Sequence, residues 1–314
     1  MRNLTWQNRS SVSEFILLGF SSQPGMQMLF FLVFLAIYLA ILFGNSLIFA
    51  LIRIDSRLHM PMYFFLANLS FLDISYTTTT VPQMLLHLLA KKKSISYTGC
   101  IIQMYIFLFL GITECILYAV MAYDRYVAIC HPLTSGHPTL IMSRSVCVKM
   151  AASSWVGGFF FGMVHTGITM RLPYCGPDEI NHFFCEVPAI LKLACEDTRV
   201  TEVVLFVMGV ILLMTPVFLI LVSYVFILAA ILRISTAEGR LKAFSTCTAH
   251  ITMVTLFYGA AMFMYMRPVS SYSPERDKYF SLFYSVVSAL LNPLIYSLRN
   301  KDVKGALVKL MGKK

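Results

Sequence analysis

Charged side chains are scarce in this chain. They make up 13% of its 314 residues, whereas hydrophobic residues make up 58% and the mean hydropathy is +0.74. Soluble globular proteins carry about 25% charged residues, which keep their surfaces solvated. The shortage excludes a soluble protein of this length and predicts a protein that crosses a membrane several times.

Three further features are missing. Short segments of alternating hydrophobicity, typical of membrane β-barrels, are absent, so we expect an all-α membrane protein. Residues 1–25 are polar and lack the apolar core of a signal peptide, so the first span is expected to direct insertion. The sequence contains no HExxH motif or comparable ligand cluster that would indicate an enzyme. Apolar runs of spanning length cover residues 27–52, 61–89, 100–121, 146–170, 202–232, 243–266 and 279–298, which predicts a seven-transmembrane helix bundle.

The polar flanks predict an orientation. Glycosylation sequons at Asn3 and Asn8 indicate an extracellular N-terminus. Seven spans then put the C-terminus in the cytoplasm, and the whole basic excess of +10 falls on the cytoplasmic flanks, as the positive-inside rule requires. The basic charge therefore needs no nucleic-acid partner. We expect an extracellular tail over residues 1–25, the bundle over 26–299 and a cytoplasmic tail over 300–314.

Asp124 and Arg125 lie side by side where the third apolar run ends. An arginine at such an edge commonly snorkels to the membrane surface. The neighbouring acid cancels that flanking charge, which favours a charged pair that acts as a functional lock.

Two carboxylates, Asp73 and Glu114, fall within the second and third spans. Ionisable groups at membrane depth are costly and generally functional. Two such acids repel each other unless one is protonated or a cation lies between them. Both a monovalent cation site and a pair of carboxyls that share a proton remain open.

The cysteines divide between the two sides. On the extracellular side, where disulfides form, lie Cys100, Cys175, Cys185 and Cys195. These four allow three pairings, and their positions do not choose among them. A metal site at His182, Cys185 and Glu186 is disfavoured, because their spacing matches no closed site. The long loop over residues 171–199 is expected to cover the mouth of the bundle. Expected to stay reduced are Cys115, Cys130, Cys147 and Cys247.

The C-terminal part combines a helix breaker with a basic segment. Asn292 and Pro293 place polar groups and a proline in the last span, which would let Tyr296 move. Residues 301–310 alternate lysines with apolar residues, which predicts a short amphipathic helix on the lipid of the inner leaflet.

Several motifs occur in order along the chain: EFILLG at 14–19, LHMPMYFFL at 58–66, MAYDRYVAIC at 121–130, SY at 223–224, KAFSTCTAH at 242–250 and NPLIY at 292–296. With them the chain resembles the odorant receptors of the rhodopsin-like G-protein-coupled class. The motif at 58–66 resembles that of the tetrapod, or class II, branch. The resemblance covers the chain from Glu14 to the C-terminus.

The resemblance implies a plasma-membrane receptor that binds a small volatile odorant in the outer half of the bundle. It also implies a heterotrimeric G protein of the stimulatory, olfactory type as partner, and a rise in cyclic AMP. Implied disulfides are Cys100–Cys185 and Cys175–Cys195, and the implied ion is an allosteric sodium at Asp73 and Glu114, with no other cofactor. The implied activation switch comprises Asp124, Arg125, Tyr224, His250, Asn292, Pro293 and Tyr296.

Two features depart from the family pattern. The loop at residues 134–137 (TSGH) is longer than usual and lacks the usual tyrosine, which affects the expected contact with the G protein. Ala289 stands where a proline is common. We therefore expect coupling efficiency and activation to be tuned differently here.

Helical spacing predicts where the ligand binds. The third, fifth and sixth spans each carry a stripe of small, methionine and aromatic residues without a charged group. The predicted ligand-binding residues are Met104, Phe107, Leu108, Gly111, Ile112, Leu205, Met208, Gly209, Leu212, Tyr258, Ala261, Met262, Tyr265 and Ser285. Tight packing of the bundle is the alternative for any one of them. The stripes together favour a neutral, mostly apolar ligand, because a charged group would be buried without a partner.

An ion-coupled transporter is the main alternative function. It would use Asp73 and Glu114 to bind the coupling ion. Internal repeats or paired broken helices, which such transporters contain, are not found in the sequence, and the number of spans is odd. The sequence therefore favours a receptor.

Overall fold

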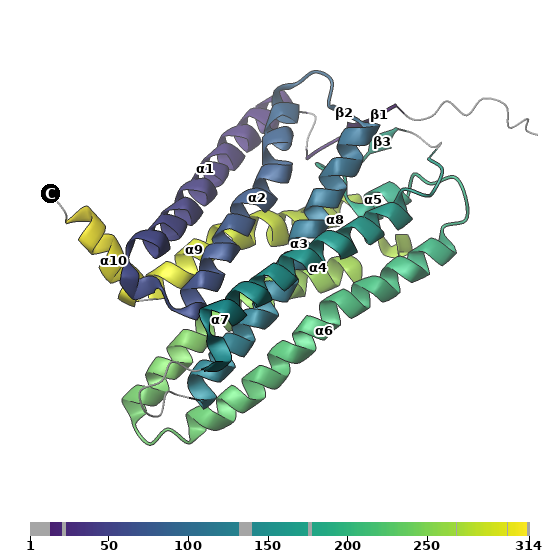
Figure 1. The fold of residues 1–314 in the computed structure, drawn as a ribbon. Helices are drawn as coiled ribbons and strands as arrows, with labels where there is room; N and C mark the ends of the chain where they lie inside the picture. The colour runs from purple at the N-terminus through teal and green to yellow at the C-terminus, as the bar shows by residue number, and fades with distance from the viewer. Residues whose placement is uncertain are drawn as a thin grey trace, which may run out of the picture.

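The computed structural model describes residues 13–20, 23–131, 140–174, 178–267, 269–299 and 301–312. Its body is a bundle of long helices (Figure 1). These are α1 (Pro24–Ile54), α2 (Pro61–Leu89), α3 (Tyr97–Cys130), α4 (Arg144–Thr169), α6 (Arg199–Leu232) and α7 (Ala237–Tyr265). A further crossing combines α8 (Pro274–Leu282), the π-helical turn η4 (Phe283–Val287) and α9 (Ser288–Arg299). The short helices are η1 (Ser56–Leu58), η2 (Leu140–Met142), α5 (Val187–Leu191), η3 (Val269–Ser271) and α10 (Lys301–Met311).

The helix ends agree with the predicted spans where local signals mark them. Helix α2 begins and ends at the predicted residues, because Pro61 is favourable in a first turn. Helix α3 continues through Cys130, beyond the predicted end at 121, since hydropathy marks the apolar stretch and not the end of the helix. Helix α7 begins earlier than predicted, at Ala237, where the Thr236 side chain accepts a hydrogen bond from the Gly239 amide.

Helix α2 carries several polar side chains within its predicted span. Six helical segments of the described chain are long and apolar enough to cross a membrane, and α2 is not among them. Its polar side chains face the interior, because Asp73, Thr77 and Thr80 are at most 2% exposed. The Thr77 hydroxyl donates to the Asp73 carbonyl oxygen at 2.8 Å, as helical threonines do. Since α2 packs against α1 and α3, it completes the seven-helix bundle.

Helices α3 and α4 approach closely through glycines. A Cβ atom at Gly158 would lie 2.0 Å from Thr113 Oγ1 and 2.7 Å from the Phe109 carbonyl oxygen. At Gly162 it would lie 2.9 Å from the Phe109 amide nitrogen. Small residues at these positions let the two backbones touch, which is how helices associate when lipid removes the hydrophobic drive between them.

One end of the bundle carries a disulfide and a small sheet; we call it the disulfide end. Cys100 at the start of α3 is bonded to Cys185, so this predicted pairing is present. Strand β1 (Glu14–Leu17) pairs antiparallel with β2 (Ser94–Ser96) and parallel with β3 (Glu179–Ile180). The sequence did not predict this sheet, which fastens the segment before α1 to the loop after α4.

Other predictions concern residues that the structure does not describe. Cys175 lies outside the described residues, so its pairing with Cys195 stays a prediction. Asn3, Asn8 and residues 134–137 also lie outside them. The cysteines predicted to stay reduced, at positions 115, 130, 147 and 247, are free.

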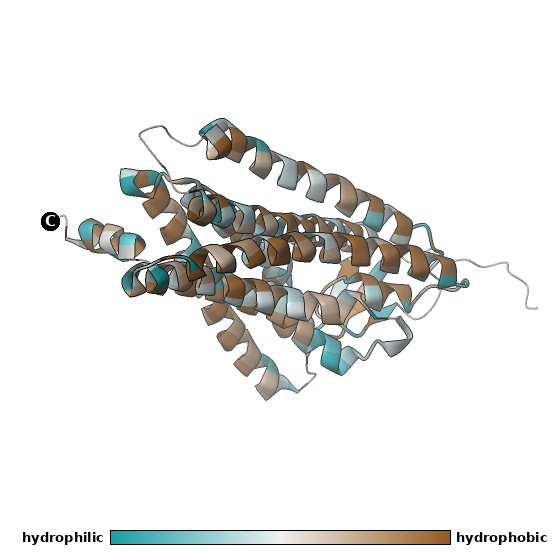
Figure 2. Cartoon of the chain, turned by 90° about the horizontal axis from the view of Figure 1, so that it is seen from below, coloured by the Kyte–Doolittle hydropathy of each residue, from teal (hydrophilic) through white to brown (hydrophobic). Residues whose placement is uncertain are grey.

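Apolar residues cover most of the length of the bundle helices, and hydrophilic ones gather near their ends (Figure 2). The C-terminal helix α10 packs against α1 and α9. Its residues Val303 and Ala306 are at most 3% exposed, whereas Val308 is 69% exposed. The predicted amphipathic helix is therefore present, with one apolar face turned to the bundle.

Candidate functional site

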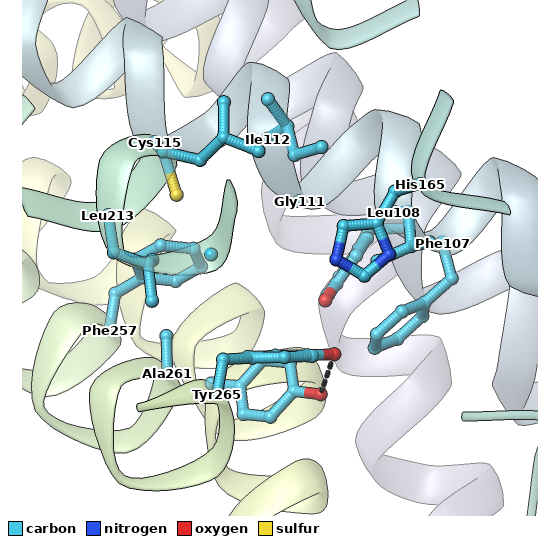
Figure 3. A pocket seen from close by; sticks show the side chains of 14 residues that line it. Phe107, Leu108, Gly111, Ile112, Cys115, His165, Leu213, Phe257, Ala261 and Tyr265 are labelled. Atoms are coloured by element: carbon cyan, nitrogen blue, oxygen red, sulfur yellow. Dashed lines mark hydrogen bonds between the residues drawn. The ribbon is translucent and has the colours of Figure 1, made fainter. Parts of the chain in front are cut away.

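A cavity of about 550 Å³ lies in the half of the bundle nearer the disulfide end (Figure 3). This volume includes the space open at the mouth of the cavity. Helices α3, α6 and α7 contribute most of its wall, and α2, α4 and η4 complete it. The cavity is lined by Tyr76, Phe107, Leu108, Gly111, Ile112, Cys115, His165, Gly209, Leu212, Leu213, Phe257, Ala261, Tyr265 and Tyr284.

Eight of the predicted ligand-binding residues line this cavity. They are Phe107, Leu108, Gly111, Ile112, Gly209, Leu212, Ala261 and Tyr265. Gly111 leaves room on the α3 wall, because the atom nearest to a Cβ there would be the Tyr76 hydroxyl oxygen, at an ordinary contact distance of 3.5 Å. Helical spacing thus identified the correct faces of α3, α6 and α7, although ligand contact itself stays a prediction.

The other six predicted residues do not line the cavity. Met104 and Leu205 pack in a separate apolar cluster nearer the disulfide end. The Tyr258 hydroxyl donates to the Cys115 carbonyl oxygen at 2.8 Å. Ser285 donates to the Ser281 carbonyl oxygen one turn earlier. Met262 packs against the main core, and Met208 is half-buried on α6. For these residues, helical spacing predicts the face of the helix from which the side chain projects. It does not predict how far along the bundle the residue lies, or which hydrogen bond its side chain forms.

Six lining residues were not predicted: Tyr76, Cys115, His165, Leu213, Phe257 and Tyr284. Tyr76 reaches the cavity from α2, where its ring stacks on Phe107 at 4.6 Å between centroids. His165 reaches it from α4. The predicted ligand-binding stripes lie on the third, fifth and sixth spans, so they include no residue of α2 or α4. Cys115 lies one helical turn beyond Gly111, so a longer α3 stripe would have included it.

The loop after α4 reaches the cavity wall through Glu186, which follows the disulfide-bonded Cys185. Glu186 Oε1 accepts hydrogen bonds from the hydroxyls of Tyr284 at 2.5 Å and Tyr265 at 3.3 Å. Its Oε2 accepts one from Ser281 at 2.8 Å. Glu186 is 1% exposed. One carboxyl group therefore joins the loop to α7, α8 and η4 at the cavity.

Burial raises the pKa of Glu186 to about 7, although hydrogen bonds from Tyr284, Ser281 and Tyr265 oppose the shift and nearby Asp277 adds to it. His182 Nε2 lies 3.2 Å from Glu186 Oε2. Burial, with a smaller effect of Lys278, lowers the pKa of His182 to about 3, so its ring is neutral near pH 7. The histidine therefore does not compensate a charge on Glu186. With Cys185 held in the disulfide, the disfavoured metal site at this place lacks its thiolate.

Deeper in the bundle, the predicted acids belong to one buried polar cluster. The Asn292 amide donates to both carboxylate oxygens of Asp73, at 2.8 and 3.1 Å. The Tyr118 hydroxyl lies 3.2 Å from Glu114 Oε1, to which it donates, and 3.5 Å from Asn292 Oδ1. All four residues are at most 2% exposed. Within the described chain no lysine, arginine or histidine forms an ion pair with either acid.

The predicted switch residues link helices near the end opposite the disulfide. Arg125 is 4% exposed and donates from a guanidinium nitrogen to the Thr246 carbonyl oxygen on α7 at 2.6 Å. An ion pair between Arg125 and Asp124 is not found in the described residues, so the arginine holds α7 and not its neighbour in sequence. Tyr224 and His250 are hydrogen-bonded at 2.8 Å, and the other nitrogen of His250 lies 3.1 Å from the Tyr118 carbonyl oxygen.

The proline of the last span is accommodated without a break. Helix α9 runs through Pro293, and the irregular turn is η4, about two to three turns earlier. Pro293 packs close to Gly44, where a Cβ atom would lie 3.1 Å from its Cγ. Tyr296 is buried on the same helix, within the electrostatic influence of Arg125.

Comparison with known proteins gives consistent results. The model of a family described as olfactory receptor matches residues 34–314. The human proteins "Putative olfactory receptor 2B3" and "Olfactory receptor 2B2" are 52% and 51% identical, over 98% and 99% of this chain and 97% and 86% of their own lengths. The crystal structure of squid rhodopsin is similar with a TM-score of 0.70 and 17% identity, over 93% of this chain and 87% of that one. Nothing in these comparisons favours a transporter.

The Glu186 carboxyl generates a prediction about pH. Its folded-state pKa of about 7 exceeds the ordinary value of 4.5, so the folded chain binds this proton more tightly than the unfolded chain. The contribution to stability is therefore fully present below pH 4.5 and is lost as the pH rises through about 7. We expect the thermal midpoint of the purified protein to fall across this window, and the fall to be much smaller in Glu186→Gln.

A matched control is Glu179→Gln, because this glutamate is exposed and lies on strand β3 of the same loop. It should retain the pH slope of the unaltered protein. An unaltered slope in Glu186→Gln, or an equal loss of slope in both variants, would contradict the assignment.

Proposed function

The chain belongs to the olfactory receptor family of seven-helix, rhodopsin-like receptors, and on that premise we propose that it binds a small, neutral, mostly apolar odorant in the cavity. Binding would activate a heterotrimeric G protein of the stimulatory, olfactory type and raise cyclic AMP. The receptor would lie in the plasma membrane with the disulfide end outside and the C-terminus in the cytoplasm. The single observation that carries the ligand assignment is the uncharged lining of the cavity.

The lining supports a neutral ligand. Aliphatic and aromatic side chains make up most of it, and none of the residues is an aspartate, glutamate, lysine or arginine. A charged amine or carboxylate would lose its hydration there without gaining a counter-ion, at a cost of several kcal/mol. Dispersion contacts and one or two hydrogen bonds are left to hold the ligand.

Helix α7 supplies the connection to the opposite end. Phe257, Ala261 and Tyr265 of α7 line the cavity, and Thr246 of the same helix accepts the Arg125 hydrogen bond. A ligand that fits better when α7 is displaced would favour loss of that bond, because a ligand shifts an equilibrium by its differential affinity for the two states. Separation of α7 from α3 would then open the cytoplasmic end to the G protein.

Filling the cavity should abolish the response. In Gly111→Trp the indole would occupy the space beside Tyr76 that the glycine leaves open. We expect loss of odorant-dependent cyclic AMP in transfected cells, with the receptor still present at the cell surface.

The matched control is Gly259→Trp, an identical change on the exposed face of α7, where a Cβ atom would meet nothing within 4 Å. This variant should respond like the unaltered receptor. A full response of Gly111→Trp, or agonists that all require a formal charge, would show that the ligand binds elsewhere.

We also propose that the cluster of Asp73, Glu114 and Asn292 holds a sodium ion in the resting receptor. The residues fit such an ion, because two buried carboxylates and an amide offer hard oxygen ligands and lack a cationic side chain in an ion pair. A carboxyl pair that shares one proton is the alternative. The ion would supply positive charge that stabilises the resting arrangement of α2, α3 and α9.

If sodium favours the resting state, raising its concentration should weaken agonist potency in the unaltered receptor. Asp73→Asn removes one carboxylate but keeps a side chain of the same shape, so its agonist potency should not depend on sodium. The comparison uses potassium at equal ionic strength and confirmed surface expression. Equal sodium dependence in both receptors would argue against an ion at this cluster.

A further inference from the structure

His165 is a buried polar residue of the cavity that lacks a partner. Its side chain is 5% exposed, and no donor or acceptor within the described residues reaches its Nδ1. The ring stands at the edge of the cavity and turns one nitrogen toward the open space (Figure 3). Within the described residues the other ring nitrogen, Nε2, forms no hydrogen bond either, and it is the one that a ligand in the cavity can reach.

Tyr76 presents a second polar group to the same space. Its ring is 2% exposed and fixed by stacking on Phe107, and its hydroxyl lies beside Gly111. Among the described residues, that hydroxyl has no hydrogen-bond partner either.

The remaining polar groups near the cavity are already engaged. The hydroxyls of Tyr265 and Tyr284 donate to Glu186, and that of Tyr258 donates to the backbone of α3. Each hydroxyl has a single proton to donate. Tyr265 and Tyr284 therefore use their protons in hydrogen bonds to the loop after α4. A ligand would have to displace Glu186 to accept a hydrogen bond from either of them.

The His165 ring is neutral, because a buried imidazolium would need an acidic partner and none of the cavity residues is acidic. A neutral ring carries one N–H donor and one acceptor nitrogen. A buried N–H without an acceptor is less tolerable than a buried acceptor without a donor. Since Nδ1 is the enclosed nitrogen, the proton belongs on Nε2, where it is available to the cavity.

We propose that His165 and Tyr76 determine ligand specificity by donating two hydrogen bonds to one uncharged oxygen of the ligand. A carbonyl oxygen has two lone pairs and no proton, so it fits two donors. The ligand class is thus a ketone, aldehyde or ester whose hydrocarbon part fills the apolar remainder of the cavity. This inference deepens the proposed function by naming the ligand chemistry.

The test compares cyclohexanone with methylenecyclohexane, which has nearly the same shape but no hydrogen-bond acceptor. Both are titrated against the purified full chain in detergent, and affinity is taken from the ligand-dependent rise of the thermal midpoint. We expect the receptor to bind the ketone roughly three to ten times more tightly than the hydrocarbon, the factor typical of one or two net hydrogen bonds. In His165→Leu and in Tyr76→Phe this ratio should fall toward one through weaker ketone binding.

Tyr76→Phe removes a single oxygen atom, so it keeps the test valid if His165→Leu folds poorly. The control on α4 is Gly167→Ala, where a Cβ atom would meet nothing within 4 Å, and it should keep the full ratio. A ratio of one in the unaltered chain, no binding of either probe, or an unchanged ratio in both variants would overturn the proposal. Because this readout needs no G protein, oxygen-dependent binding without a cyclic AMP response would count against the proposed function alone.

Discussion

The carboxyl group of Glu186 connects parts of the chain that are far apart in sequence. The disulfide to Cys100 fixes its neighbour Cys185 at the start of α3, and Gln103 of the same helix accepts a hydrogen bond from the Cys185 amide at 2.9 Å. From that anchored position Glu186 receives the hydroxyls of Ser281, Tyr284 and Tyr265. A buried carboxyl without these donors would be costly, so the loop, α7 and η4 are held in one arrangement. That arrangement holds Tyr265 and Tyr284, two residues of the cavity wall.

The need of buried polar groups for hydrogen-bond partners applies along the whole bundle. In an apolar interior each polar group must find a partner, and several of the partners found here lie on other helices. Asn292 joins α9 to Asp73 of α2, Tyr224 joins α6 to His250 of α7, and Arg125 joins α3 to the backbone of α7. A change of state that moves α7 must break or exchange the last of these bonds. This gives an odorant in the cavity a physical route to the opposite end under the proposed function.

Much of the fold could be predicted from the sequence, because apolar length and proline position are local properties. The extent of α2 and the amphipathic nature of α10 follow from such properties alone. Strand β1 could not be predicted, since its pairing with β2 and β3 depends on contacts between distant segments of two to four residues. The Cys100–Cys185 pairing came from the family resemblance, because position left three possibilities open.

The cavity likewise separates what helical spacing can predict, the face on which a residue lies, from what it cannot, the position of the free space along the bundle. A helical period fixes which face a residue occupies, and Gly111, Gly209 and Ala261 line the cavity together. It does not fix how far along the bundle the free space extends, which is why Met104 and Leu205 lie outside the cavity lining. Nor does the helical period show that the Ser285 hydroxyl already donates a hydrogen bond to the Ser281 carbonyl oxygen.

Under the proposed function, the odorant occupies the cavity walled by α3, α6 and α7. A cryo-electron microscopy structure of the receptor bound to an agonist and its G protein would test this placement. We expect ligand density in contact with Gly111 and Ala261, and an Arg125 side chain released from the Thr246 carbonyl. Ligand density outside this cavity, with the cavity itself filled by protein side chains, would contradict it.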